Sequence, residues 1–179
     1  FICSAGKWSD ERSKICKECE AGRYIVDDSA NSTNHDSLED CTVCSRGYYS
    51  LKGSSTCSEC PGGTYLEDDD TSAADHNELA DCHVCTVGKY SDSGAHICTN
   101  CIAGKYLIGF EAMAHDGEHS CKTCNSGFWS NETSGLCMAC SAGRYLQDNA
   151  TAPEEHDTQE DCLICKSGTW SSEGANLCE

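Results

Sequence analysis

The chain has 179 residues, a formal net charge of −18 at neutral pH and 18 cysteines. Leu, Ile, Val and Phe together number only 23, which excludes an ordinary hydrophobic core and, without other support, predicts disorder. Cysteine supplies that support, because disulfide cross-links replace the missing core in small secreted domains.

Disulfides persist in oxidising compartments, so the cysteine content predicts an extracellular or cell-surface location. The acidic balance excludes nucleic acid as a partner, because phosphate would be repelled, and favours cations or basic protein surfaces. No apolar run in this segment is long enough for a membrane span, and no signal peptide is present in it. The cysteine pattern starts and stops in mid-repeat, so we expect a mature or excised segment of something longer.

The cysteines define a repeat. Every internal pair reads Cys-x2-Cys, and the gaps between pairs alternate between 12 and 21 residues, with one gap of 19. The second cysteine of each pair, like Cys3, begins the same motif, Cys-x2-Gly-x-aromatic. In chain order, short modules at 3–16, 44–57, 85–98, 124–137 and 165–178 alternate with long modules at 19–41, 60–82, 101–121 and 140–162, and together they form one continuous array over 1–179.

The recurring phrase has a direct physical interpretation. The glycine permits a positive φ in a tight turn, and the aromatic two residues later supplies most of the buried area of the module, packed against its own disulfide. In the long modules Ile25, Leu66, Leu107 or Leu146 follows, which predicts a strand of two or three residues. No segment has helical periodicity. We therefore expect a small disulfide-rich fold, mostly irregular, with short β-hairpins and no large hydrophobic core.

If the first and last cysteine of each module pair with each other, every cysteine of the chain has a partner. If the pairs instead cross between neighbouring modules, two cysteines have no partner, either Cys3 and Cys178 or Cys16 and Cys165. Sequential pairing is favoured, and crossed pairing stays open. A zinc ribbon also fits Cys-x2-Cys spacing, but zinc would not require Gly-x-aromatic after every second cysteine. The favoured pairs are Cys3–Cys16, Cys19–Cys41, Cys44–Cys57, Cys60–Cys82, Cys85–Cys98, Cys101–Cys121, Cys124–Cys137, Cys140–Cys162 and Cys165–Cys178.

The Cys-x2-Gly-x-Tyr phrase closed by Cys-x2-Cys resembles the cysteine-rich repeats of ephrin receptors and, more loosely, the first module of tumour necrosis factor receptor domains. It is most similar to the long tandem form of many protist and algal surface proteins. The resemblance covers the whole chain and implies an elongated extracellular rod of small disulfide modules. The chain departs from tumour necrosis factor receptors, whose six-cysteine module has crossed bonds, so their cytokine binding is not carried over.

The four long modules share a histidine six residues before the closing cysteine, followed by Asp or Asn. We assign these histidines a structural role, in which the ring packs on the loop and one nitrogen bonds a carbonyl or carboxylate. The shared histidines are His35, His76, His115 and His156.

Two aspartates recur with them in three of the four long modules, 13 residues apart, and the third long module loses both together, with Gly109 and Ser120 in their places. Their joint loss indicates a shared task, and a Ca²⁺ site is one hypothesis, because hard cations take oxygen ligands from irregular loops. The alternative is that the acids keep the loop solvated and bond its backbone turns. The calcium candidates are Asp27, Asp28, Asp36 and Asp40; Asp68, Asp69, Asn77 and Asp81; and Asp148, Asn149, Asp157 and Asp161.

Three sequons, at Asn31, Asn131 and Asn149, predict N-linked glycans in a secreted chain, and abundant Ser and Thr allow O-linked glycans. Five basic residues follow turn glycines and are interpreted as a solvated face: Lys7, Arg23, Lys89, Lys105 and Arg144.

No catalytic constellation is present, so we expect no enzyme and no required cofactor. The leading hypothesis is a structural repeat segment of a glycosylated fibre, cell wall or surface appendage that self-associates into a filament or matrix. The alternative is the stalk or ligand-binding ectodomain of a surface receptor or adhesin, with a protein or glycan ligand.

Overall fold

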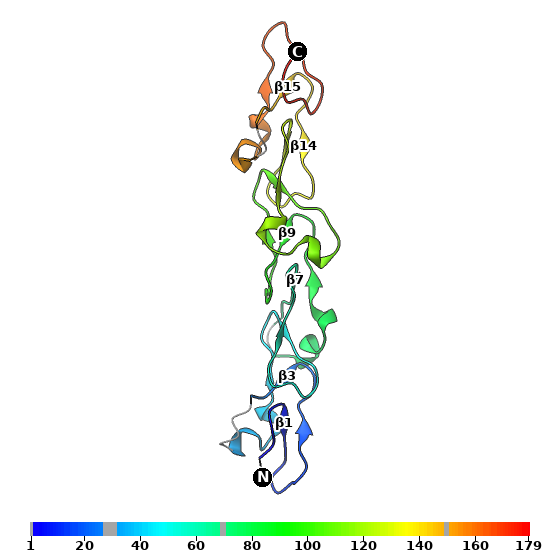
Figure 1. The fold of residues 1–179 in the computed structure, drawn as a ribbon, viewed down its shortest axis with the longest axis vertical. Coiled ribbons are helices and arrows are strands. Elements are labelled where there is room, and N and C mark those ends of the chain that lie inside the picture. The colour runs from blue at the N-terminus through cyan, green and yellow to red at the C-terminus, as the bar shows by residue number, and fades with distance from the viewer. Residues whose placement is uncertain (1, 27–31, 69–70, 149–150) are drawn as a thin grey trace. The chain divides into compact units, whose positions relative to one another are not determined.

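The computed structural model describes residues 2–26, 32–68, 71–148 and 151–179. Two compact units form, one from Phe1–His83 with Ser93–Ile97 and the other from Val84–Asp92 with Cys98–Glu179. Both contain the same two kinds of module, built from two-residue strands (Figure 1). Within the described residues there is no α-helix, and no helix is long and apolar enough to cross a membrane.

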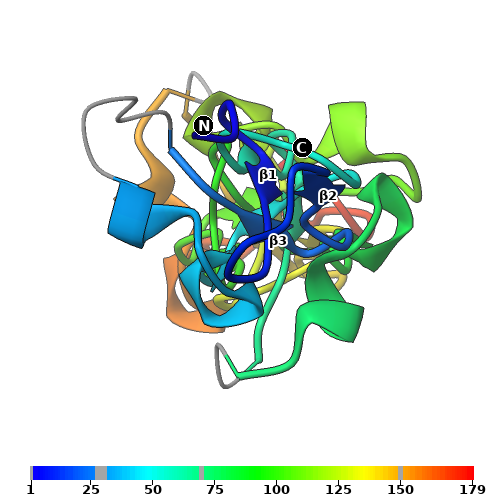
Figure 2. The same cartoon turned by 90° about the horizontal axis from the view of Figure 1, so that it is seen from below.

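The strands of the first half of the chain form hydrogen-bonded pairs, each with its second strand directly after the closing cysteine of a module. Figure 2 shows β1, β2 and β3 close together at the N-terminal end. The pairs are β1 (Lys7–Trp8) with β2 (Lys17–Glu18), β3 (Arg23–Tyr24) with β4 (Thr42–Val43), β5 (Tyr48–Tyr49) with β6 (Ser58–Glu59), and β7 (Thr64–Tyr65) with β8 (His83–Val84). The long modules add the 3₁₀ turns η1 (Ser32–Asn34), η2 (Leu38–Asp40), η3 (Ala73–His76) and η4 (Leu79–Asp81).

The second half repeats this order. The pairs are β9 (Lys89–Tyr90) with β10 (Thr99–Asn100), β11 (Lys105–Tyr106) with β12 (Lys122–Thr123), β13 (Phe128–Trp129) with β14 (Met138–Ala139), and β15 (Arg144–Tyr145) with β16 (Leu163–Ile164). Its 3₁₀ turns are η5 (Ala112–Ala114), η6 (Glu118–Ser120), η7 (Pro153–Glu155) and η8 (Gln159–Asp161). The 3₁₀ turns are the elements that the sequence patterns did not predict.

All 18 cysteines form disulfides, and each disulfide closes one module. The bonded pairs are those of the sequential pairing: Cys3–Cys16, Cys19–Cys41, Cys44–Cys57, Cys60–Cys82, Cys85–Cys98, Cys101–Cys121, Cys124–Cys137, Cys140–Cys162 and Cys165–Cys178. Since each bond ties the two ends of a hairpin together, strands of only two residues are held without a large core. The predicted small disulfide-rich fold of short hairpins is confirmed.

The hydrophobic core is divided into four small clusters, one for each long module. Each contains the disulfide of the long module, the Ile or Leu after its aromatic, and the aromatic ring of the preceding short module. Trp129, for example, packs on Cys140, Leu146 and Cys162. The ring of a short module therefore packs on the disulfide of the next module, whereas the sequence predicted packing on its own. The apolar side chains of the short loops, such as Leu51 and Leu136, are exposed and do not cover the ring.

The turn glycines extend this contact one module further. Gly104 has a φ of +82°, and a Cβ atom placed on it would lie 1.9 Å from the carbonyl oxygen of Pro153, in the next long module. Gly22 has the same relation to Ala73. These positions require glycine both for the left-handed backbone conformation and for the close approach of a second backbone.

Candidate functional site

The four recurrent histidines lie where a long module meets the short module before it. All four side chains are buried, with at most 2% of each residue exposed. In each, Nδ1 bonds the carbonyl oxygen of the residue between the turn glycine and the aromatic of the short module, at 2.6–2.8 Å. The acceptors, in chain order, belong to Lys7, Tyr48, Lys89 and Phe128.

The backbone of each histidine completes this contact. Its carbonyl oxygen accepts the amide of the serine that follows the short-module aromatic, as in Ser50 N to His76 O and Ser130 N to His156 O, both 2.9 Å. One histidine thus bonds a carbonyl through its ring and an amide through its main chain, both at the edge of a two-residue strand. Among the described residues, no other strand pairs with that edge. We call this arrangement the histidine clamp.

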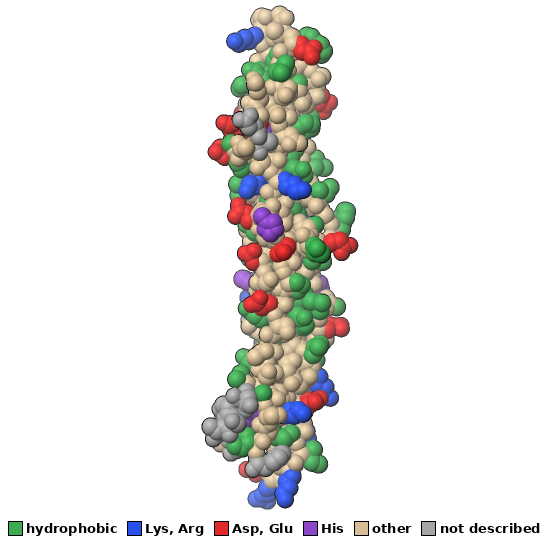
Figure 3. Space-filling model, viewed as in Figure 1, with side chains coloured by type: hydrophobic (Ala, Val, Ile, Leu, Met, Phe, Trp, Pro, Cys, Tyr) green, Lys and Arg blue, Asp and Glu red, His purple; other side chains and the backbone are tan. Residues whose placement is uncertain are grey.

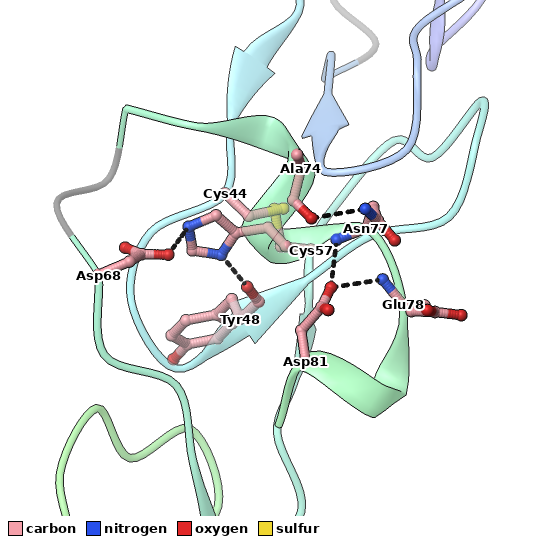
Figure 4. Close-up of polar contacts among 9 residues, drawn as sticks. Cys44, Tyr48, Cys57, Asp68, Ala74, Asn77, Glu78 and Asp81 are labelled. Carbon is pink, nitrogen blue, oxygen red and sulfur yellow. Dashed lines mark hydrogen bonds and ion pairs between the residues drawn. A yellow bond between two sulfur atoms is a disulfide. The ribbon is translucent and has the colours of Figure 1, made fainter. Parts of the chain in front are cut away.

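In the second, third and fourth long modules, the other ring nitrogen faces a second acceptor from the same long loop. His76 Nε2 lies 2.5 Å from Asp68 Oδ2, and Figure 4 shows the ring between Asp68 and the carbonyl of Tyr48. His156 has the same distance to Asp148. Because Nδ1 already donates to a carbonyl, a hydrogen bond between Nε2 and the carboxyl group requires an additional proton shared by the pair.

The later aspartate of each loop has a different task. Asp81 Oδ2 accepts the backbone amides of Asn77 at 2.8 Å and Glu78 at 3.0 Å, and so caps the turn that follows the histidine (Figure 4). Asp40 accepts the amides of Asp36 and Ser37, and Asp161 accepts that of Thr158. These are the turn hydrogen bonds that the alternative to a calcium site predicts.

The third long module shows how the two tasks separate. With Gly109 in place of the early aspartate, His115 Nε2 lies 3.2 Å from the Gly109 carbonyl oxygen. With Ser120 in place of the late aspartate, the Ser120 hydroxyl donates to the Asp116 carbonyl at 3.2 Å. Within the described residues the two positions therefore make separate contacts: the early aspartate contacts the histidine, and the late aspartate caps a turn.

Replacing Asp161 by alanine is expected to destabilise only its own turn, by about 1 kcal/mol, since it removes a cap from backbone amides. Hydrogen exchange at the Thr158 amide, which bonds Asp161, measures this directly. The matched control is Glu160→Ala, which alters an exposed neighbour in the same turn. Equal exchange in the two variants would contradict the capping role.

The calcium hypothesis stays a prediction. Among the residues that the structure describes, no three carboxylate, imidazole or thiolate groups gather as a metal site. Asp36 and Asp157 follow the clamp histidines, whereas Asp27, Asp28, Asp69 and Asn149 lie outside the described residues. Melting in EDTA and in millimolar Ca²⁺ tests the hypothesis: a Ca²⁺-dependent rise in Tm supports it, and an unchanged Tm eliminates it.

Of the three glycosylation candidates, Asn131 is exposed on the fourth short module, so its side chain is open to modification. Asn31 and Asn149 lie outside the described residues. N-linked and O-linked glycans remain predictions, and glycosidase treatment of the native protein followed by intact-mass measurement tests them.

Two further contacts depart from the sequence analysis. Arg23 and Arg144, interpreted as part of a solvated face, donate from Nη1 to the carbonyl oxygens of Cys41 and Cys162, the closing cysteines of their own modules. Their position directly before the long-module tyrosine is the signal that could have identified this role.

Burial raises the pKa of Tyr90 above its ordinary value, and the nearby Glu118 and Asp92 carboxylates add to the shift.

The surface itself has no single charged face in the view of Figure 3, where acidic, basic and hydrophobic side chains are interspersed. The third long module differs from the others, because it exposes Ile108, Phe110 and Met113 beside a cavity of about 360 Å³.

Residues 32–76 match the family model described as tyrosine-protein kinase ephrin type A/B receptor-like. The matched segment runs from the first long loop, through the second short module, to the clamp histidine of the second long module. No curated protein matches the chain. The match over this segment and the nine tandem disulfides support cysteine-rich repeats of the ephrin-receptor-like type.

Proposed function

We propose that this chain, which carries ephrin-receptor-like cysteine-rich repeats, is a non-catalytic extracellular structural segment that adds length and stiffness to a glycosylated fibre, wall or surface appendage. This repeat type is characteristic of extracellular receptor ectodomains. Nine disulfides agree with an oxidising, extracellular or cell-surface location.

The observation that carries the proposal is the histidine clamp, repeated in all four long modules. Each clamp, together with the packing of the short-module ring on the next disulfide, fixes one module on its neighbour. Stability is then a sum of local contacts, so modules can be added without a new core. Such a chain needs no bound cofactor. Its function requires that copies of the chain associate with one another into a filament or matrix.

A receptor or adhesin stalk is the second candidate, and the ephrin-receptor-like match favours it. In this case the array would hold a protein or glycan ligand away from a membrane. The exposed Ile108, Phe110 and Met113 of the third long module provide a surface of the kind that protein ligands use.

Small-angle scattering of the glycosylated, oxidised chain tests the structural role. Stiffly joined modules predict the cross-section and length distribution of a rod, unchanged after addition of EDTA. A flexible, coil-like profile would contradict the proposal. For the stalk, electron microscopy of native material that shows short, monodisperse particles with a bound partner would replace the first candidate by the second.

A further inference from the structure

The third long module carries far less charge than the other long modules. Residues 101–121 contain three acidic residues and one basic residue, whereas 19–41 and 140–162 each contain six acidic residues and one basic residue. Residues 60–82 contain seven acidic residues and no Lys or Arg. In a chain with a net charge of −18, the third long module is therefore the long module at which a second acidic molecule meets the least repulsion.

A cavity lies at the same position of the first three long modules. Its lining includes the second residue after the tyrosine, the residue before the clamp histidine and the residue after the closing cysteine. Asp40 and Asp81 also line the first two cavities, whereas Ser120 takes their place in the third, which no carboxylate lines among the described residues. The third cavity is thus apolar and basic where the other two are acidic. The equivalent lining residues, in module order, are Val26, Asn34 and Thr42; Glu67, Asp75 and His83; and Ile108, Ala114 and Lys122.

The shortened loop of the third long module holds apolar side chains beside this cavity. A Cβ placed on Gly109 would lie 2.4 Å from the Ala114 Cβ, so the backbone at Gly109 packs directly on η5. Ile108 and Met113, on the two sides of this tight loop, both line the cavity. Phe110 within the loop is 86% exposed and Met113 is 90% exposed. Neighbouring apolar side chains this exposed mark an interaction surface.

This surface has both halves of a contact. Phe110 is an exposed aromatic anchor, and the cavity of about 360 Å³ has room for an aromatic ring against Leu107 and Met113. The charges are complementary in the same sense. Glu111 directly follows the anchor, Lys122 lines the cavity, and both side chains are exposed. A ring that enters the cavity from a second copy therefore brings its own acidic neighbour toward a lysine.

We call Ile108, Phe110, Glu111, Met113 and Lys122 the pairing face. We infer that the pairing face binds the pairing face of a second copy of this chain about a two-fold axis. Phe110 of each copy enters the cavity of the other, and Glu111 of each copy lies opposite Lys122 of the other. Because the same patch serves both copies, the contact is isologous and closes as a pair.

A second copy fits this face better than a foreign protein, because the chain itself carries the required ligand, an aromatic side chain followed by a carboxylate. The inference rests on the proposed structural function and deepens it, since it assigns the self-association to one module. The contact lies in the third long module because that module alone, among the long modules, combines the apolar loop with a low density of acidic residues.

Sedimentation equilibrium of the glycosylated, oxidised chain tests the pairing. A monomer–dimer equilibrium is expected at chain concentrations up to about 1 mM. Phe110→Ser is expected to raise the dissociation constant of the dimer at least about tenfold, because it removes the central anchor. The matched control is Ile15→Ser, which removes an apolar side chain that is 74% exposed on the first short module, and it is expected to leave the dissociation constant unchanged. Intact masses that show nine disulfides confirm that both variants are folded.

Charge reversal tests the two-fold arrangement. Glu111→Lys alone places two basic side chains opposite each other at both ends of the contact, and Lys122→Glu alone places two acidic side chains there. Each variant by itself is therefore expected to dimerise more weakly than the unchanged chain. An equimolar mixture of the two variants restores both opposite-charge pairs and is expected to form a mixed dimer at least about threefold more tightly than either variant alone.

A chain that stays monomeric up to about 1 mM would overturn the inference. So would a dimer whose dissociation constant is unchanged by Phe110→Ser, or charge variants that bind each other no better than themselves. The proposed structural function has a separate readout, because small-angle scattering of the Phe110→Ser chain reports the stiffness of the array without the pairing contact. A rod-like profile together with a failed pairing test would remove the pairing face and leave the structural function standing.

Discussion

Gly104→Ala is expected to destabilise the contact between the third and fourth long modules by about 3–5 kcal/mol or to prevent correct disulfide formation. Two costs add. The residue has a φ of +82°, where an L side chain is strained, and the new methyl would lie 1.9 Å from the Pro153 oxygen. The opposing atom is backbone, so it cannot rotate away.

The matched control for this variant is Gly143→Ala. Gly143 has nearly the same φ, +80°, but no atom of the described residues lies within 4 Å of the added methyl, so the expected cost is only the backbone strain, about 1 kcal/mol. Oxidative refolding yield, followed by hydrogen exchange at the Gly104 amide, measures the difference. Equal behaviour of the two variants would show that packing between next-but-one modules does not contribute to stability.

His156→Ala is expected to open the junction between the fourth short and fourth long modules, at a cost of about 3–5 kcal/mol. The substitution leaves the Phe128 carbonyl without its imidazole donor and removes the imidazole from the carboxyl group of Asp148, whose side chain is 4% exposed. Removing one member of a buried polar pair costs more than the net value of the hydrogen bond, because the remaining group stays desolvated.

Hydrogen exchange at the Ser130 amide, which donates to the His156 carbonyl, measures the opening. His119→Ala is the control, because His119 is exposed in the neighbouring long module, and it is expected to change stability by less than about 0.5 kcal/mol. His156→Asn, whose amide can reach the Phe128 carbonyl, is expected to recover part of the loss. If His156→Ala and His119→Ala behave alike, the clamp has no structural role.

The sequence was informative about the hairpins of the modules, although it did not predict their 3₁₀ turns or the contacts of Arg23 and Arg144 with the closing cysteines. The cysteine spacing and the Gly-x-aromatic phrase predicted hairpins, and the recurrence of His35 and its equivalents predicted a structural histidine. These features are local, because a disulfide loop of 13–22 residues confines its own turn and strand.

Contacts between modules were not predicted, because their partners lie in different repeats. Trp129 packs on the disulfide of the next module, and the partner of His156 is a carbonyl 28 residues earlier. Along the chain, each histidine and its carbonyl partner are 28 residues apart in three of the long modules. They are 26 residues apart in the third long module, which is two residues shorter, and this constant offset is the sequence signal of the partner. A carbonyl has no residue identity, so residue patterns alone do not reveal it.

Amide hydrogen exchange of the native, oxidised chain tests the central claim most directly, namely that within each unit the modules are fixed on their neighbours. Stacked modules predict slow exchange at the junction amides of Gly22 and Ser50 in one unit and of Gly104 and Ser130 in the other, each hydrogen-bonded to the following module. Slow exchange confined to the hairpin strands, with these four amides fast, would show that the modules are independent of one another and would contradict the account.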